Sequence, residues 1–231
     1  MTDFSTLAGR PTKITACGFG WTHAGRTQPA LADIDLVIEP GERVLLCGDS
    51  GSGKSTFLAA IAGVLGSDEE GTRAGKLLLE VSTGAMEEPG HSIPVGLVLQ
   101  DPDSQVISAR IGDDIAFGCE NLAYPREEIW RRVSAAKNLV GPFVNLDFPT
   151  ERLSGGQKQR LALAGVIAMG AGVVLLDEPT ANLDPAGARD VVRAVSALVE
   201  ETGATLVVVE HQHSAWEGLL DRAVELSLIH I

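Results

Sequence analysis

The sequence predicts an α/β fold with a mainly parallel central sheet, an N-terminal antiparallel β subdomain and a helical subdomain. Three observations lead to this prediction. Short apolar runs alternate with helical patterns, which is typical of parallel strands buried on both faces. Residues 33–38 alternate between polar and apolar types, and residues 125–140 carry apolar residues at helical spacing.

The strands of the parallel sheet are expected at four runs rich in β-branched residues. These runs are 44–47, 95–99, 173–176 and 206–209. Residues 12–38 are expected to form hairpin-like strands, and residues 77–81 are expected to join them in a small antiparallel sheet. A further strand-like run lies at 224–226.

Helical patterns fall between these runs. Residues 113–121 and 125–140 each predict a helix, and the stretch 161–169 is apolar on most faces, which indicates a buried helix. Asp184 followed by Pro185 has the residue types preferred at the N-cap and the first position of a helix.

Composition fits one large domain. The 231 residues are 45% apolar, enough to bury a full core, and we expect a single domain over residues 1–226 with the helical subdomain at about 101–165. The net charge of −13 gives no basic surface of the kind that nucleic-acid binders need, so we expect no nucleic-acid partner. Three scattered cysteines without CxxC spacing argue against a disulfide framework or a zinc site.

The C-terminus of the domain is expected to be truncated, because the strand-like run at 224–226 is followed by no turn and no partner strand in the sequence. Residues 227–231 are expected to be a non-native tail. The hypothesis behind this expectation is that the closing letters LSLIHI can be translated from a transposon-end adapter used in sequencing libraries.

A glycine-rich loop joins the run 44–47 to a helical pattern and fits G-x-x-x-x-G-K-S. In this pattern backbone N–H groups converge on phosphates, the lysine (Lys54) reaches the β- and γ-phosphates, and the hydroxyl (Ser55) binds Mg²⁺. An ordinary turn rich in Gly and Ser would not require the strand before it and the helix after it. The predicted nucleotide-binding residues are Gly48, Asp49, Ser50, Gly51, Ser52, Gly53, Lys54, Ser55 and Thr56.

Polar residues that follow the predicted strands complete the candidate site. Asp177 can hold Mg²⁺, and Glu178 beside it can orient and deprotonate an attacking water. Because the carboxyl ends of parallel strands meet at one edge of a sheet, we expect Gln100 to reach Mg²⁺ or the water and His211 to reach the γ-phosphate. Each of these residues, taken singly, is more often an ordinary loop residue.

A second glycine-rich helix start consists of Ser154, Gly155, Gly156 and Gln157. An N-cap explains Ser154 alone, but two glycines and a glutamine leave backbone N–H groups available to an anion. One chain cannot easily place both helix starts on one nucleotide. We therefore predict ATP hydrolysis in a dimer, in which residues 154–157 contact the ATP of the partner chain.

Two further residues have competing interpretations. Trp21 precedes the glycine-rich loop, where its ring could stack on adenine, but packing in the core would also explain it. Asp184 could bridge to the partner's site, although its role as an N-cap is already a sufficient explanation.

From Trp21 to His211 the order of these motifs resembles that of the ATP-binding cassette (ABC) ATPases. The resemblance implies an ABC ATPase fold on a P-loop NTPase core, and a head-to-tail dimer that holds two ATP molecules between phosphate loops and signature segments. It also implies Glu178 as the catalytic base, His211 as a switch residue, Asp184 as the D-loop residue and Gln100 as a link to a membrane partner.

Finer motifs resemble the energy-coupling-factor group within that family. These motifs are QDPDSQ at 100–105, FGCENL at 117–122, QKQR at 157–160 and AGV at 164–166. Two residues depart from the group's pattern: Cys119 stands where proline is common, and Glu210 stands where threonine commonly precedes the histidine.

The resemblance to this group implies the Mg²⁺-dependent ATPase subunit of an importer for a vitamin or for a transition-metal ion such as cobalt or nickel. It implies three partners, which are a second ABC ATPase subunit, a transmembrane coupling subunit and a substrate-binding membrane subunit. The chain would then lie at the cytoplasmic face of the cell membrane and dock the coupling subunit through residues 101–121.

Alternatives stay open. A soluble ABC ATPase that acts on ribosomes or DNA would need a coiled-coil insertion, a basic surface or a second cassette, and the sequence has neither of the first two. A small-molecule kinase on the same scaffold would not explain residues 154–157. The sequence does not distinguish a homodimer, a heterodimer and a fused double cassette.

Overall fold

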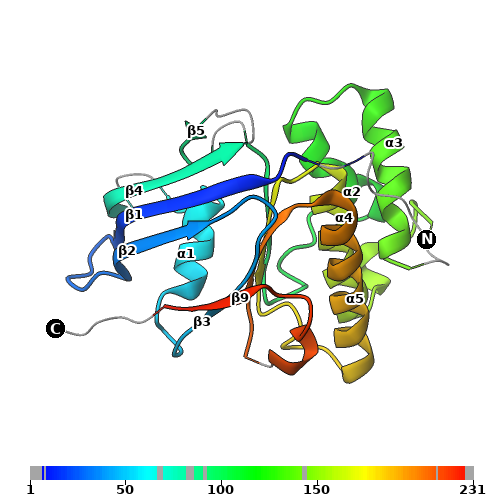
Figure 1. The fold of residues 1–231 in the computed structure, drawn as a ribbon. Coiled ribbons are helices and arrows are strands. Elements are labelled where there is room, and N and C mark those ends of the chain that lie inside the picture. The colour runs from blue at the N-terminus through cyan, green and yellow to red at the C-terminus, as the bar shows by residue number, and fades with distance from the viewer. Residues whose placement is uncertain are drawn as a thin grey trace.

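The computed structural model describes residue 7 and residues 9–66, 70–81, 86–90, 93–141, 145–211 and 213–226. The expected non-native tail, residues 227–231, lies outside the described residues. Two sheets and a group of helices make up the described part of the chain (Figure 1).

The N-terminal sheet is antiparallel, in the order β2-β1-β4-β5. Its strands are β1 (Thr12–His23), β2 (Leu31–Ile38), β4 (Gly71–Val81) and β5 (Met86–Glu87). The register of β1 shifts around Gly18, where φ is 52° and the backbone N–H donates a 2.8 Å hydrogen bond to a carboxylate oxygen of Asp35. The expected antiparallel subdomain is confirmed, and β4 is longer than the run that predicted it.

The second sheet is parallel throughout, in the order β6-β7-β8-β3-β9. Its strands are β3 (Arg43–Cys47), β6 (Val95–Val98), β7 (Val173–Asp177), β8 (Thr205–Val209) and β9 (Arg222–Glu225). All residues of β7 and β8 are buried, as expected for central strands covered on both faces. The predicted central sheet is confirmed, and the run near residue 224 forms the edge strand β9.

The α-helices are α1 (Lys54–Ile61), α2 (Ile111–Asn121), α3 (Arg126–Ala136), α4 (Gly155–Ala168) and α5 (Pro185–Thr202). Short 3₁₀ helices lie at Lys137–Leu139, Thr150–Arg152 and His213–Trp216. Within the ranges that the structure describes, no helix is long and apolar enough to cross a membrane.

Two apolar clusters pack on opposite faces of the parallel sheet. One contains Phe57 and Leu58 of α1 together with Val44 and Leu46 of β3 and residues of the antiparallel sheet. The other contains Leu45 of β3 and residues of α2, α3, α4 and α5. This alternation along β3 follows the two-residue period of a strand.

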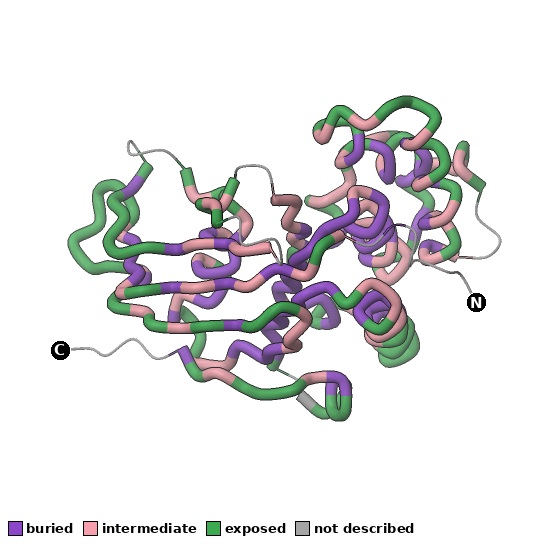
Figure 2. Tube along the Cα trace, turned by 45° about the horizontal axis from the view of Figure 1, so that its top comes forward, coloured by how far each residue is buried: buried purple, intermediate pink, exposed green. Residues whose placement is uncertain are grey.

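The layers therefore run from the antiparallel sheet through α1 and the parallel sheet to the remaining helices (Figures 1 and 2). Because the sheet is parallel, the carboxyl ends of β6, β7, β8 and β3 lie along one edge, and the loops that follow these strands carry the predicted site residues.

Candidate functional site

The glycine-rich loop connects β3 to α1 and depends on glycine for its path. Gly48, Gly51 and Gly53 have φ angles of 141°, 82° and 91°, a region that other residues rarely adopt. A Cβ atom on Gly53 would lie 2.4 Å from the carbonyl oxygen of Ala30. Larger residues would therefore displace the loop from the N-terminus of α1, where backbone N–H groups attract anions.

The lysine of this loop is held inside it. The Nζ atom of Lys54 donates hydrogen bonds of 2.8 Å to the carbonyl oxygens of Gly48 and Asp49, and the residue is only 7% exposed. Among the described residues, the hydroxyl of Ser52 is buried and has no hydrogen-bond partner. A buried ammonium and an unpartnered hydroxyl within one loop fit a ligand rich in oxygen, such as a phosphate group.

The other predicted residues of this segment lie at the tip of the loop and in the first turn of the helix. Asp49 and Ser50 are exposed at the tip, and Ser55 and Thr56 follow Lys54 in α1. The whole predicted set is thus arranged around one loop and one helix start.

Ser55 and Asp177 meet between α1 and the end of β7. Burial raises the pKa of the Asp177 carboxyl, and a hydrogen bond from the Ser55 side chain acts in the opposite direction. A hydroxyl and a carboxylate are oxygen ligands of the kind that Mg²⁺ prefers. The pair therefore fits the magnesium ion that the sequence predicts.

Glu178 and His211 face each other across adjacent loops. The Oε1 atom of Glu178 lies 3.0 Å from Nε2 of His211, and the two side chains are 21% and 56% exposed. The backbone N–H of Glu178 donates a 2.8 Å hydrogen bond to the carbonyl oxygen of Val209, and its φ of 47° is unusual for a residue other than glycine. The Glu178 carboxylate is partly solvated and lies beside the carboxyl ends of β7 and β8, so it can orient a water molecule there.

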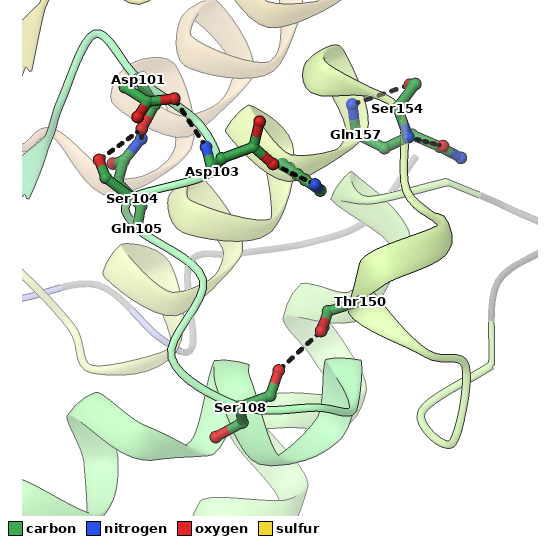
Figure 3. Close-up of polar contacts among 9 residues, drawn as sticks. Asp101, Asp103, Ser104, Gln105, Ser108, Thr150, Ser154 and Gln157 are labelled. Atoms are coloured by element: carbon green, nitrogen blue, oxygen red, sulfur yellow. Dashed lines mark hydrogen bonds and ion pairs between the residues drawn. The ribbon is translucent and has the colours of Figure 1, made fainter.

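Gln100 is exposed in the loop that follows β6. The next residues form a compact turn, in which Asp101 accepts hydrogen bonds from the Asp103 N–H at 3.0 Å and from the Ser104 hydroxyl at 2.9 Å (Figure 3). The carbonyl oxygen of Gln100 accepts a 3.4 Å hydrogen bond from Asn182, which lies in the loop after β7. Gln100 thus sits at the same sheet edge as Glu178.

A buried glutamine, Gln159 of the QKQR motif, connects this loop to α4, a role that the sequence analysis did not predict. The Nε2 atom of Gln159 donates to the carbonyl oxygens of Leu99 at 2.9 Å and Pro179 at 3.2 Å, and its Oε1 atom accepts from Gln105 at 2.9 Å. Gln159 is 1% exposed. Its position one helical turn before the buried Leu163 was the available signal, since it puts the residue on the inner face of α4.

The segment 154–157 forms a capping box at the start of α4. The hydroxyl of Ser154 accepts from the Gln157 N–H at 3.3 Å, and the Gln157 side-chain oxygen accepts from the Ser154 N–H at 2.9 Å (Figure 3). The glutamine therefore has a capping role besides the predicted contact with a partner's ATP. The N–H groups of Gly155 and Gly156 have no partner within the helix, as is general for the first turn.

A groove of about 390 Å³ lies over this helix start. Its walls include Ser154, Gly155, Gly156 and Asp184. The Oδ1 atom of Asp184 accepts the Gly187 N–H at 2.8 Å, so the residue is the N-cap of α5. No residue of the glycine-rich loop lines the groove, and the two predicted phosphate contacts thus belong to separate surfaces of the described chain.

Trp21 lies in the core beneath the antiparallel sheet. The residue is 6% exposed, and its Nε1 atom donates a 3.2 Å hydrogen bond to Nδ1 of His23. The structure therefore favours the competing interpretation of Trp21 as a packing residue, and stacking on adenine stays a prediction.

Comparison with known proteins places these motifs in a family. The profile of the family described as "ABC transporter" matches residues 31–181. An ABC transporter ATP-binding protein of Methanosarcina acetivorans is 38% identical over 205 residues, which cover 88% of this chain and 32% of that protein.

Two other relatives are more similar in length. The energy-coupling factor transporter ATP-binding protein EcfA1 of Caldanaerobacter subterraneus subsp. tengcongensis is 41% identical over 193 residues, which cover 80% of this chain and 66% of that protein. The structure of cbiO1 from Clostridium perfringens, part of the ABC transporter complex cbiONQ, is 30% identical with a TM-score of 0.76 and covers 93% of this chain and 84% of its own. The chain thus spans about a third of the Methanosarcina acetivorans protein and about two thirds of EcfA1.

Proposed function

The chain belongs to the ABC transporter family of ATP-binding proteins, and from this membership we propose that it is the ATP-binding and ATP-hydrolysing subunit of an energy-coupling-factor importer. The transported solute would be a vitamin or a transition-metal ion such as cobalt or nickel. Both the similarity to EcfA1 and that to cbiO1 of the cbiONQ complex support this type of importer.

The separation of the two phosphate contacts carries the proposal. The phosphate loop closes around Lys54 on one surface, while the groove at Ser154 and Asp184 opens on another. A second ABC subunit in head-to-tail orientation would bring its own groove onto the ATP bound at this loop. This arrangement explains why one chain has two helix starts suited to phosphate.

The chemistry follows from the positions of the side chains. The ammonium of Lys54 and the N–H groups of the loop bind the phosphates, and Ser55, Asp177 and Gln100 supply oxygen ligands for Mg²⁺. The ion, when bound, neutralises negative charge on the transferring phosphoryl group. Glu178 orients the attacking water and accepts its proton, while His211 holds the Glu178 carboxylate and reaches toward the γ-phosphate.

The partners are a second ABC subunit, a transmembrane coupling subunit and a substrate-binding membrane subunit, with this chain bound at the cytoplasmic face of the membrane. Docking of the coupling subunit at residues 101–121 would explain the exposure of Ile107 and Phe117, which are 60% and 39% exposed. A membrane subunit in contact with these residues also lies close to the loop of Gln100, so it would sense the state of the site.

Affinity purification of the tagged chain from its source cells tests the proposal. We expect integral membrane proteins to co-purify with the chain and to stimulate its ATP hydrolysis. Recovery of ribosomes or DNA in place of membrane proteins would support the soluble ABC ATPase alternative and contradict the importer.

A further inference from the structure

Glu210 is a buried carboxylate between β8 and His211. It is 4% exposed, although acidic side chains at the end of a strand commonly reach solvent. Burial of a carboxylate is unfavourable unless hydrogen bonds satisfy its oxygens. The hydrogen-bond partners of Glu210 therefore indicate which segments of the chain its side chain positions.

The two oxygens of Glu210 bind two different loops. The Oε1 atom accepts a 2.9 Å hydrogen bond from the backbone N–H of His211, and the Oε2 atom accepts a hydrogen bond from the hydroxyl of Thr180, which is itself 8% exposed. Thr180 lies two residues after Glu178 in the loop that follows β7. One carboxylate thus connects the loop of the proposed catalytic base to the loop of the proposed switch histidine.

The Thr180–Glu210–His211 hydrogen bonds lie beside Glu178, whose backbone has an unfavourable conformation. Glu178 has a φ of 47°, a conformation that persists only where the surroundings enforce it. The Glu178 N–H donates a 2.8 Å hydrogen bond to the carbonyl oxygen of Val209, the last residue of β8. Glu210 follows Val209 directly in the chain. The backbone bond and the Thr180–Glu210 bond together fix the two loops on which the Glu178–His211 contact of 3.0 Å depends.

We propose that Glu210, through the Thr180 hydroxyl and the His211 N–H, is a positioning residue that sets the contact between Glu178 and His211. The inference rests on the proposed ATPase function and deepens it. Glu210 is buried and acts through its neighbours, so its loss slows the chemical step and leaves nucleotide binding intact.

Matched pairs of variants distinguish the effect of losing the hydrogen bonds of Glu210 from the effect of losing its charge and from a failure to fold. Glu210→Ala removes the hydrogen bonds to Thr180 and to the His211 N–H, whereas Glu210→Gln can keep these two, because its oxygen accepts the His211 N–H and its amide donates to the Thr180 oxygen. Thr180→Val removes the hydroxyl at nearly constant shape, and Thr180→Ser retains it. Steady-state ATP hydrolysis by the chain with its membrane partners gives kcat and KM, and thermal melting reports folding.

We expect Glu210→Ala and Thr180→Val to lower kcat roughly ten- to a hundredfold with little change in KM for ATP, as for small misplacements of reacting groups. Glu210→Gln and Thr180→Ser should stay close to the wild-type kcat. In a His211→Ala background, Glu210→Ala should cause no further loss, since its target is already absent.

A wild-type kcat in Glu210→Ala would overturn the proposal, as would a loss beyond that of His211→Ala in the double variant. If Glu210→Ala does not fold, the comparison of Thr180→Val with Thr180→Ser tests the proposal. Equal kcat values for these two variants would contradict a role of the Thr180–Glu210 hydrogen bond. Absence of hydrolysis by the wild-type complex would instead defeat the proposed function itself.

Discussion

The Oε1 atom of Glu178 lies 3.0 Å from Nε2 of His211, so the residues that follow β7 and β8 meet at one edge of the parallel sheet. The register of the sheet produces this contact, because Asp177 pairs with Val209. Glu178 follows Asp177 directly and His211 lies two residues after Val209, so the proposed general base and the proposed switch histidine lie on the same side of the site.

Replacement of Glu178 by Gln should separate binding from chemistry. The variant keeps the shape of the side chain and loses the group that accepts a proton, so we expect ATP binding to persist and kcat to fall about 10² or more. Equilibrium binding of a fluorescent ATP analogue and steady-state hydrolysis measure the two effects. Wild-type turnover in this variant would remove Glu178 from the proposed role.

Replacement of Ser55 by Ala should weaken the use of magnesium. The variant loses one of the two oxygen groups that meet beside the phosphate loop, and we expect hydrolysis to require several-fold more Mg²⁺. A magnesium titration of the ATPase rate measures this requirement. ATP binding without magnesium serves as the internal control and should be similar in variant and wild type; an unchanged titration curve contradicts the assignment.

Gln159 should contribute to the stability of the fold. Replacement by Leu leaves the carbonyl oxygens of Leu99 and Pro179 without this donor, and the expected loss in the free energy of unfolding is about 1–3 kcal/mol. Denaturant unfolding measures the loss.

The neighbouring Lys158 offers a matched control. It forms an ion pair with Asp103, and the two side chains are 15% and 75% exposed, so replacement of Lys158 by Met, which keeps the aliphatic stem and removes the charge, should cost at most about 1 kcal/mol. Equal stability losses for the Gln159 and Lys158 variants would show that the buried hydrogen bonds of Gln159 stabilise the fold no more than an exposed ion pair does.

The pair of Glu42 and Arg222 predicts a pH-dependent contribution to stability. The hydrogen bond from Arg222 holds the pKa of Glu42 below its ordinary value, and Arg222 also donates to the carbonyl oxygen of Val37 at 2.6 Å. Since the folded-state pKa is lowered, the stabilisation is complete above the ordinary pKa of about 4.3 and is lost as pH falls through the lowered pKa.

Replacement of Arg222 by Gln should therefore reduce stability by about 1 kcal/mol or less at neutral pH, since the pair is partly exposed. The gap to wild type should narrow as the pH is lowered below about 4.3. Unfolding curves at several pH values measure the gap, and Arg193→Gln, at an exposed ion pair on α5, is the control. A gap that is constant from neutral to acidic pH would mean that Glu42 makes no contribution through its charge.

Much of the fold could be predicted because local patterns and tertiary packing agree. The apolar runs at β7 and β8 have no alternative to burial on both faces, and the Asp184-Pro185 pair begins α5 where the sequence indicates. The irregular pairing of β1 around Gly18 was not foreseen, because it depends on a contact with Asp35 in the next strand.

The candidate site could be predicted where the residues of a motif themselves determine the local backbone conformation. The glycine-rich loop has the positive φ angles that its sequence demands. Gln159 and Glu210 lie in or beside motifs, but the motifs do not show their contacts, because their hydrogen-bond partners are 54 and 30 residues away in the chain. Only the folded arrangement of three strand ends brings those partners together.

The head-to-tail arrangement of two cassettes is the central claim, and complementation of two inactive variants tests it most directly. Lys54→Ala disables the phosphate loop, and Ser154→Arg fills the groove at the start of α4. In a mixture, a dimer of one of each contains one site with an intact loop and an intact groove, so we predict that mixing restores ATP hydrolysis that neither variant has alone. A mixture as inactive as its components, under conditions in which the wild-type chain hydrolyses ATP, would contradict the account.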